Sequence, residues 1–316
     1  AASKAELKEF IRLPWRLYRG DRHWVPPLIM DMKNLLDRSK NPFFQHSEAD
    51  YFLAVKNGKP VGRIAAILNN NHNAFHREKT GFFGFFESID EQEVAAALLE
   101  TAEAWARERQ QDRLRGPMNF STNDTCGMLI EGYDAPPLVM MTYNPPYYNR
   151  LLEKSGYQKC EDLLAYRQFT KQGFNPRLRK IAESARQIPG LTVRKMNKKK
   201  FWDEVQLIQK IYNNAWSNKW GFVPMTDAEI HHLAKELKPV VDARYVYLAE
   251  IDGEAAAFAL SLPDYNQALI KINGRLLPFG LFKLLYYARK IDVLRVMILG
   301  VVNTVSFRGY WNPTKP

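Results

Sequence analysis

Histidine pairs are the residues in this sequence whose spacing comes nearest to metal chemistry. His72 and His76 are four residues apart, a spacing that on a helix would place two imidazoles on one face, as in many zinc sites. Their setting, NNNHNAFHREK, predicts a loop, and no third ligand is evident, so we expect no metal site. His231 and His232 are adjacent in a predicted helix and point to different sides of it, so they cannot form such a pair.

Nucleophilic motifs are missing from the sequence. It contains no Gly-x-Ser-x-Gly elbow and no P-loop, and neither Cys126 nor Cys160 has a neighbouring histidine with a catalytic signature. Two cysteines are too few for a disulfide framework or a cysteine-built zinc site, which favours a reducing, cytoplasmic location. These observations exclude the common hydrolase and kinase classes.

Positive charge is concentrated in one segment. Lysine and arginine exceed aspartate and glutamate by 45 − 34 = 11 over the chain, and by 11 − 3 = 8 within residues 171–210 alone. Such a segment could attract nucleic acid, the phosphates of a nucleotide cofactor or an anionic membrane surface. Loop-forming residues, namely Gly173, Asn175-Pro176 and Pro189-Gly190, favour a solvated connector instead.

The composition is that of a globular protein. With 316 residues, 46% hydrophobic and 25% charged, the chain is long enough for about two domains. The most apolar stretch, residues 276–302, is interrupted by five charged residues, so we expect no membrane span. The first residues lack both a secretory signal and an initiator methionine, and we expect the chain to begin within its gene.

Alternating strand and helix patterns must position any functional residue in the first half. Asn57-Gly58 is a strong hairpin signal between two predicted strands, because both residue types tolerate positive φ. The predicted elements are a helix at 7–19, strands at 51–55, 61–68 and 81–86, a helix at 91–109, strands at 114–118 and 138–143, a helix from 145 to 154 and a strand pair within 157–169.

The second half repeats this pattern. It begins with a strand at 191–196, helices at 201–216 and 227–237, and strands at 244–251 and 255–262 around a second hairpin signal, Asp252-Gly253. The segment Phe52-Leu53-Ala54 with Gly58 matches Tyr247-Leu248-Ala249 with Gly253 at a constant offset of 195 residues. A period of this length predicts tandem copies of one α/β fold.

This order of elements resembles that of the GNAT acyltransferase superfamily. The segment NPPYYNRLLEKSGYQK, residues 144–159, is similar to its N-x-x-A-x-x-L-Y-E-K-x-G-F signature. FIRLPWRLYRGDRHWVPPL, TGFFGFFE and RGPMNFSTND resemble a bacterial group with two such domains in tandem. The resemblance implies an α/β fold of the α+β type, with two tandem GNAT-like domains whose sheets are mixed and mostly antiparallel. The expected parts are a first domain at 1–170, a basic connector at 171–190 and a second, truncated domain at 191–316.

The resemblance places the acyl-CoA site in the second domain. It implies that one strand pairs with the pantetheine arm and that the pyrophosphate loop begins just after it. The matching residues are Ile298, Leu299, Gly300, Val301, Val302, Arg308 and Gly309. Trp311 stands where the first glycine of that loop belongs, so we expect the fragment to bind acetyl-CoA weakly or not at all and to be inactive.

The first domain departs from the family pattern. Between Glu87 and Glu93 the sequence has four carboxylates and no glycine, which would repel a pyrophosphate and indicates a copy that does not bind CoA. Glu87 stands where some family members place a general base, and an acidic helix cap is the alternative. Leu152 replaces the tyrosine that commonly serves as general acid, and Tyr148 lies one turn earlier. We assign no catalytic residue on this basis.

Polar loop residues of the first domain match positions that face the acceptor cleft in the family fold. They are Asn119, Asn123, Asp124, Tyr143 and Asn144. A purely turn-forming role for the asparagines and the aspartate is the alternative interpretation.

The favoured function is transfer of an acyl group, expected to be acetyl, from acyl-CoA to a small-molecule or peptide amine, without a metal. A non-catalytic ligand-binding or interaction module is one alternative. An aminoacyl-tRNA-dependent transferase is the second, and the basic segment is its support; nucleic acid is expected as a partner only in that case. An unpaired strand near residues 293–302 also predicts self-association.

Overall fold

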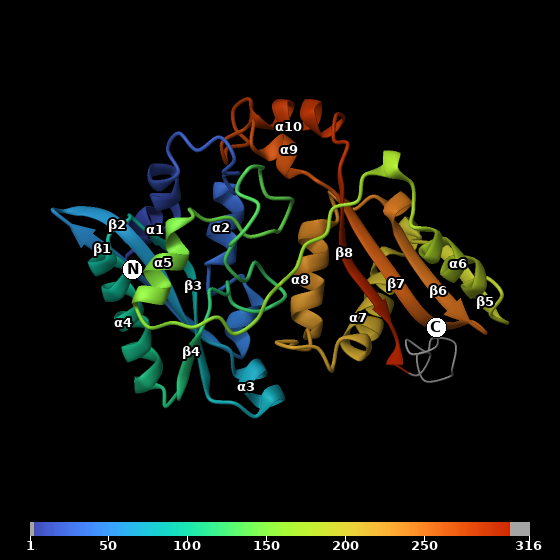
Figure 1. Ribbon diagram of the computed structural model, residues 1–316, viewed down its shortest axis with the longest axis horizontal. Coiled ribbons are helices and arrows are strands. Elements are labelled where there is room, and N and C mark those ends of the chain that lie inside the picture. Colours follow the sequence, from blue (N-terminus) through green and yellow to red (C-terminus); the bar gives the residue numbers. More distant parts are fainter. Residues whose placement is uncertain (1–2, 304–316) are drawn as a thin grey trace. The chain divides into compact units, whose positions relative to one another are not determined.

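The computed structural model describes residues 3–303, which divide into two compact units (Figure 1). Of the described residues, unit 1 comprises 3–160, 221–223 and 264–293, and unit 2 comprises 161–220, 224–263 and 294–303. Residues 264–293 thus belong with the first unit although they follow most of the second in sequence. The linear boundaries expected at 171–190 stay a prediction, which limited proteolysis can test.

Unit 1 contains a four-stranded sheet in the order β1-β2-β3-β4. The pairs β1-β2 and β2-β3 are antiparallel, and β3-β4 is parallel. Asn57 and Gly58 both have positive φ, so the predicted first hairpin is confirmed. The strands are β1 (Glu48–Lys56), β2 (Lys59–Leu68), β3 (Thr80–Ser88) and β4 (Arg113–Arg115).

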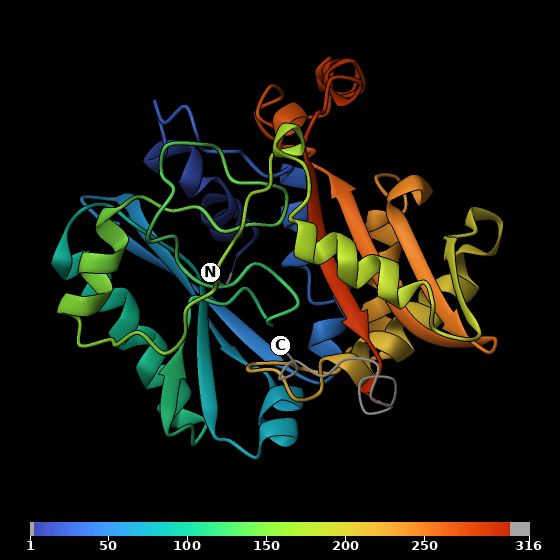
Figure 2. The same ribbon diagram turned by 45° about the vertical axis from the view of Figure 1, so that its right-hand side comes forward.

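Helices cover both faces of this sheet (Figure 2). Side chains alternate along β2, so that Ile64 and Ala66 pack with α4 and α5, whereas Ala65 and Ile67 pack with α1 and α2. The helices of unit 1 as a whole are α1 (Lys4–Leu17), α2 (Ile29–Leu35), α3 (Asn70–His76), α4 (Gln92–Glu108), α5 (Tyr147–Lys154), α9 (Asn266–Leu269) and α10 (Gly280–Ala288).

Unit 2 contains a second four-stranded sheet, in the order β5-β6-β7-β8, with every pair antiparallel. Asp252 and Gly253 have positive φ and form the predicted second hairpin. Thr226 caps α8 with a reciprocal bond to Glu229. The elements are β5 (Leu191–Lys195), β6 (Val246–Ile251), β7 (Glu254–Pro263), β8 (Leu294–Val301), α6 (Pro176–Ala185), α7 (Phe201–Ala215) and α8 (Asp227–Leu237).

The fold class is therefore α+β, with two GNAT-like units and mostly antiparallel sheets. Short 3₁₀ helices complete the described elements: η1 (Pro42–Gln45), η2 (Thr170–Gln172), η3 (Lys198–Lys200) and η4 (Ala243–Tyr245).

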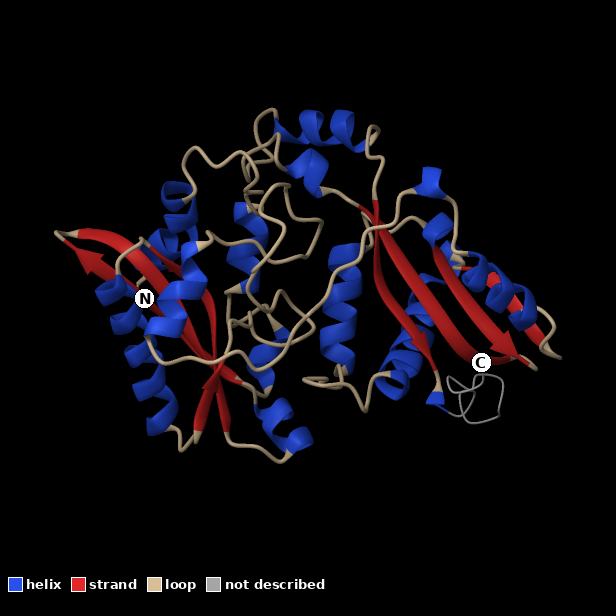
Figure 3. Cartoon of the chain, in the orientation of Figure 1, coloured by secondary structure: helices blue, strands red, loops and turns tan. Residues whose placement is uncertain are grey.

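Two predicted strand regions are wrong. Residues 138–143 lie in the long loop between β4 and α5 (Figure 3), because Met140 has positive φ and Met141 N closes a turn on Leu138 O. Residues 157–169 form no strand either: their backbone joins neither sheet, and residues 158–169 are all exposed. The strand expected at 114–118 is shorter and lies at Arg113–Arg115.

Two predicted loops contain helices. The segment around His72 forms α3, because Asn69 Oδ1 accepts a hydrogen bond from His72 N and caps the helix. The basic connector contains α6, which begins where Asn175 caps and Pro176 occupies the first helical position. The sequence predicts a loop at Asn175-Pro176, but these residues start a helix.

Candidate active site

A buried carboxylate lies near the end of β3 in unit 1. Glu87 is paired with Arg63 of β2 in the ladder, and their side chains meet with Arg63 Nη2 3.3 Å from Glu87 Oε1. Only 6% of the Arg63 side chain and 13% of the Glu87 side chain are exposed. Arg63 Nη1 also donates to Phe10 O at 2.6 Å, and the guanidinium lies over the Phe10 ring. The charges are thus held together inside the unit.

Tyrosine hydroxyls surround this carboxylate. Tyr148 OH donates to Glu87 Oε2 at 2.7 Å and accepts from Ser88 N at 3.0 Å. Tyr147 OH donates to Ser88 O at 2.8 Å, so two successive residues of α5 contact the same strand end. The Tyr18 side chain, at the end of α1, also interacts with Glu87. We call Tyr18, Arg63, Glu87 and Tyr148 the carboxylate centre.

Burial sets the proton affinity of this centre. It raises the pKa of Glu87 above its ordinary value, against the opposing effects of the Arg63 guanidinium and the Tyr148 hydroxyl. Burial, and then the Glu87 charge, raise the pKa of Tyr18 and of Tyr148 well above 10. A carboxylate with raised pKa in a mostly water-excluded site can take a proton from an ammonium group that reaches it.

A β-bulge accompanies the centre. The register of β3 against β2 shifts by one residue between Arg63 and Ala65, and Phe85 adopts positive φ there. Phe85 N donates to Asn119 Oδ1 at 2.8 Å. The side chain of Asn119 therefore holds the bulged backbone, which fixes the strand end that carries Glu87.

The other predicted acceptor residues are engaged in loop structure. Asn123 Nδ2 donates to Val223 O, and Asp124 Oδ2 accepts from Ser121 Oγ. Asn144 is buried and bonded to the backbone of Leu129 through both amide atoms. Tyr143 OH donates to Asp21 Oδ2 at 2.8 Å, and its ring lies 6.1 Å from that of Tyr18. Acceptor binding by these residues stays a prediction.

Two of the carboxylates that follow Glu87, those of Asp90 and Glu91, form ion pairs. Arg150 bonds to Asp90, and Lys56 Nζ lies 2.5 Å from Glu91 Oε2. Glu91 is the N-cap residue of α4 and makes no side-chain cap bond. Glu87 does not cap α4, so the helix-cap interpretation of Glu87 is wrong.

In unit 2 the predicted pantetheine-binding residues form most of β8. Ile298, Leu299, Gly300 and Val301 lie in the strand, and Val302 N donates to Ala256 O directly after it. Among the described residues β8 is an edge strand, and it too carries a one-residue register shift. The Leu299 carbonyl accepts a 3.2 Å bond from Trp216 Nε1. Arg308, Gly309 and Trp311 lie outside the described residues, and cofactor binding stays a prediction.

The histidine pair sits on one face of α3. The rings of His72 and His76 are 4.4 Å apart, and His72 is 1% exposed. Burial, with a smaller contribution from His76, lowers the pKa of His72 to about 4. Between residues 3 and 303 no cluster of three or more potential metal ligands is found.

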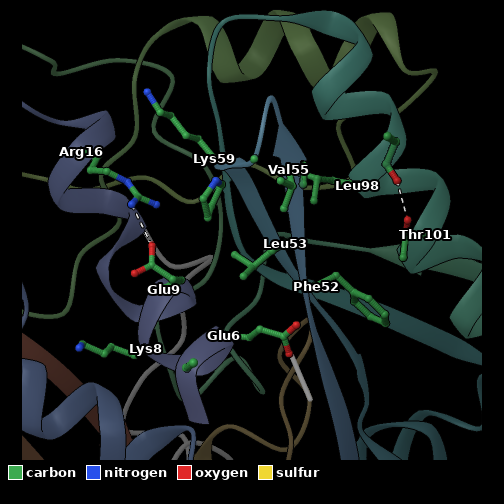
Figure 4. Close-up of a pocket in the computed structure, with 15 residues that line it drawn as sticks. Glu6, Lys8, Glu9, Arg16, Phe52, Leu53, Val55, Lys59, Leu98 and Thr101 are labelled. Atoms are coloured by element: carbon green, nitrogen blue, oxygen red, sulfur yellow. Dashed lines mark hydrogen bonds and ion pairs between the residues drawn. The ribbon is translucent and has the colours of Figure 1, made fainter. Parts of the chain in front are cut away.

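A groove of about 920 Å³ lies elsewhere in unit 1, along the outer edge of β1 (Figure 4). Its floor is apolar, with Leu53, Val55 and Leu98, and charged side chains of α1 and the hairpin line its rim. In unit 2 the equivalent edge of β6 is paired with β5. No member of the carboxylate centre lines the groove, so we interpret it as an open strand edge and not as a reaction site.

Sequence reasoning singled out Glu87 and Tyr148 and missed Arg63 and Tyr18. A signal for Arg63 was present: it is the only charged residue in VGRIAAIL, an otherwise apolar strand. A lone charge in a buried strand requires a partner, and Glu87 is the partner that the register supplies.

The two α+β units have the GNAT-like fold that the sequence predicts, and sequence comparison shows the family of the chain. The chain is 39% identical over 300 residues to a protein of Caulobacter vibrioides (strain NA1000 / CB15N) named bacterial ceramide synthase, covering 94% of this chain and 78% of that protein. It is 38% identical over 308 residues to protein YghO of Escherichia coli (strain K12), covering 96% and 78%. The chain belongs to the family of these two proteins.

Other comparisons are more distant. No family model matches the chain. A tandem GNAT protein from the clavulanic acid biosynthesis pathway is 13% identical with a TM-score of 0.45, covering 83% of this chain and 72% of that one. FemX is 11% identical with a TM-score of 0.34, covering 98% and 81%.

Proposed function

We propose that this chain is an acyltransferase that moves a long acyl group from acyl-CoA to the amine of a long-chain amino alcohol. The observation that carries the proposal is the 39% identity along 94% of the chain to the protein named bacterial ceramide synthase. A ceramide is the amide of a fatty acid and a long-chain amino alcohol, so its synthesis from the amine is an N-acylation. This proposal replaces the acetyl group expected from the sequence by a longer chain.

The carboxylate centre supplies the base that this reaction needs. An amine is protonated near neutral pH and becomes a nucleophile only after losing a proton. The Glu87 carboxylate, whose pKa is raised by burial, takes that proton more readily than an exposed glutamate would. The amine then attacks the thioester carbonyl, the C–N bond forms and the C–S bond breaks. The nitrogen loses its second proton in this step, and the departing CoA sulfur takes up a proton, so the charges balance.

Arg63 and Tyr148 position the carboxylate for this task. They hold one carboxylate oxygen each, so the side chain has little freedom to rotate. We infer a positioning role for both residues, because their bonds are to Glu87 and not to a reacting group. Tyr148→Phe should therefore lower kcat less than removal of the carboxylate.

The test is an assay of the purified protein with palmitoyl-CoA and sphinganine, in which the N-palmitoyl product is measured by mass spectrometry. Glu87→Gln keeps the shape of the side chain and removes the base, so kcat should fall about 100-fold or more. The acidic limb of the pH profile of kcat/KM should also disappear.

Glu91→Gln is the matched control. Glu91 lies four residues further along the chain, at the N-cap of α4, and is paired with exposed Lys56, so the variant should keep the activity of the parent protein. Failure of the parent protein to form product would overturn the proposed function. An active Glu87→Gln variant would overturn the assignment of the base.

A further inference from the structure

An exposed apolar helix in unit 1 has no role in the site described above. Within α10 only Gly280 is buried. Large apolar side chains on and just before this helix face solvent: Phe279 and Phe282 are each 70% exposed, and Leu277 is 79% exposed. Leu285 and Tyr286 are more than half exposed as well. The helix follows α9 in the chain and packs against it (Figure 1).

These side chains form a stripe along one side of the helix. Phe279, Phe282 and Tyr286 follow one another at intervals of three and four residues, the spacing of neighbours on a helix surface. Helix α4 of the same unit turns its corresponding stripe, with Leu98 and Trp105, into the core. A contiguous exposed patch of this kind marks a surface that binds an apolar partner.

Cations flank the apolar stripe. Residues 275–290 contain four basic residues, Arg275, Lys283, Arg289 and Lys290, and no aspartate or glutamate. Lys290 Nζ lies 2.8 Å from Tyr286 OH and 4.3 Å from the centre of its ring. An apolar face edged by lysine, arginine and tyrosine matches the boundary between the acyl chains and the anionic headgroups of a lipid layer.

The length of α10 determines how it could meet a lipid layer. Nine residues of α-helix extend about 13.5 Å, whereas spanning the hydrocarbon core takes about 20 residues. A helix of this length can lie in the plane of the interface but cannot cross it. None of the described helices is long and apolar enough to span a bilayer.

We propose that α10, with Leu277 and Phe279, is a docking surface for membranes rich in anionic phospholipid. Phe279 and Phe282 would enter the acyl-chain boundary, while Lys283, Arg289 and Lys290 contact the phosphates. A second copy of the chain is disfavoured as occupant, because pairing two such faces would bring eight cations together without a counter-charge. The proposal goes beyond the proposed function and does not depend on it, since membrane binding needs no turnover.

The experiment is co-sedimentation of the full chain with vesicles of phosphatidylcholine, alone or mixed with 40% phosphatidylglycerol. We expect binding to the mixed vesicles at least tenfold stronger than to phosphatidylcholine alone, and reduced by high salt. The double variant F279S/F282S should lose at least 90% of the binding. Both side chains are exposed, so its thermal unfolding should match that of the parent chain.

Charge variants separate this surface from the other basic segment. K283Q/R289Q/K290Q should abolish the preference for phosphatidylglycerol. R177Q/R179Q/K180Q, which removes three charges from exposed α6, should keep it. Loss of binding only in the α6 variant would overturn the proposal. So would a dimer in sedimentation velocity that F279S/F282S dissociates while vesicle binding is absent.

Discussion

The two sheets carry opposite chemistry at the same place in their ladders. The offset of 195 residues between the hairpins maps Arg63 onto Phe258. Arg63 is paired with Glu87, and Phe258 is paired with Gly300. Both β3 and β8 carry a one-residue register shift near this pair. One unit therefore buries an ion pair where the other packs an aromatic ring on a glycine.

This difference shows what the fold itself requires at this position. The Phe258 and Gly300 pair fills the space without charge, so the ladder does not need the ion pair for stability. Burying an arginine and a glutamate costs desolvation energy that their attraction repays only when the geometry is good. Their presence in unit 1 is therefore better explained by a chemical role of Glu87 than by folding.

The largest expected loss of stability comes from removing Arg63 while Glu87 is kept. Arg63→Met leaves Glu87 buried without its cation, so the free energy of unfolding at pH 8 should fall by about 3 to 5 kcal/mol. Because the folded state then favours protonated Glu87 even more, the loss should shrink as the pH is lowered toward 5. Urea denaturation at several pH values measures both effects.

The double variant Arg63→Met with Glu87→Gln completes the cycle. Removing the charge from both sides should restore much of the stability lost in the single variant, as the neutral pair in unit 2 suggests. A double variant no more stable than Arg63→Met alone would show that Arg63 acts mainly through its packing on Phe10.

The hairpins could be predicted because their signals are local. Asn57-Gly58 and Asp252-Gly253 permit positive φ whatever surrounds them, and both turns form. The strand pair expected within 157–169 would need other strands to pair with, and the residue pattern of the segment does not show whether such strands are available. The α3 helix was missed because asparagine is a turn former in isolation, and Asn69 becomes a cap once the helix is packed.

The carboxylate centre shows the same limit. Glu87 and Tyr148 were found because each stands at a position with meaning in the family pattern. Tyr18 comes from the end of α1, 69 residues before Glu87, and no spacing rule links a helix end to a strand across that distance. The pairing of Arg63 with Glu87 required the bulged register, which a sequence of alternating residues does not reveal.

A second contrast lies in the connections before β3 and β8. In the connection before β3, α3 buries His72 against Phe82, with a distance of 4.8 Å between the ring centres. In the connection before β8, α10 remains exposed. Burial lowers the pKa of His72 from 6.5 to about 4, and Glu78, 3.5 Å away, opposes this only in part. The folded state thus favours the neutral ring.

The stabilising effect of neutral His72 is present above pH 6.5 and is lost as the pH falls toward 4, by about 3 kcal/mol in all. His72→Leu cannot take up this proton, so its stability should depend less on pH in that range and should exceed that of the parent chain at pH 4.5. Chemical denaturation between pH 4 and 8 checks this. His232→Gln in unit 2 removes a more exposed histidine and is the control. If this variant flattened the pH profile of stability, the assignment of that pH dependence to His72 would be contradicted.

The smallest expected change in stability concerns Phe258 and Gly300, the apolar pair that takes the place of Arg63 and Glu87 in unit 2. A Cβ placed on Gly300 would lie 2.8 Å from Cε1 of Phe258, so Gly300→Ala requires the ring to move and should destabilise the protein by about 1 to 2 kcal/mol. Phe258→Leu makes room, so the two changes together should cost less than the sum of their separate costs. Thermal and urea unfolding of the three variants measure this coupling. Strictly additive costs would mean that Phe258 does not determine the need for glycine, and that the two ladders differ by more than one exchanged pair.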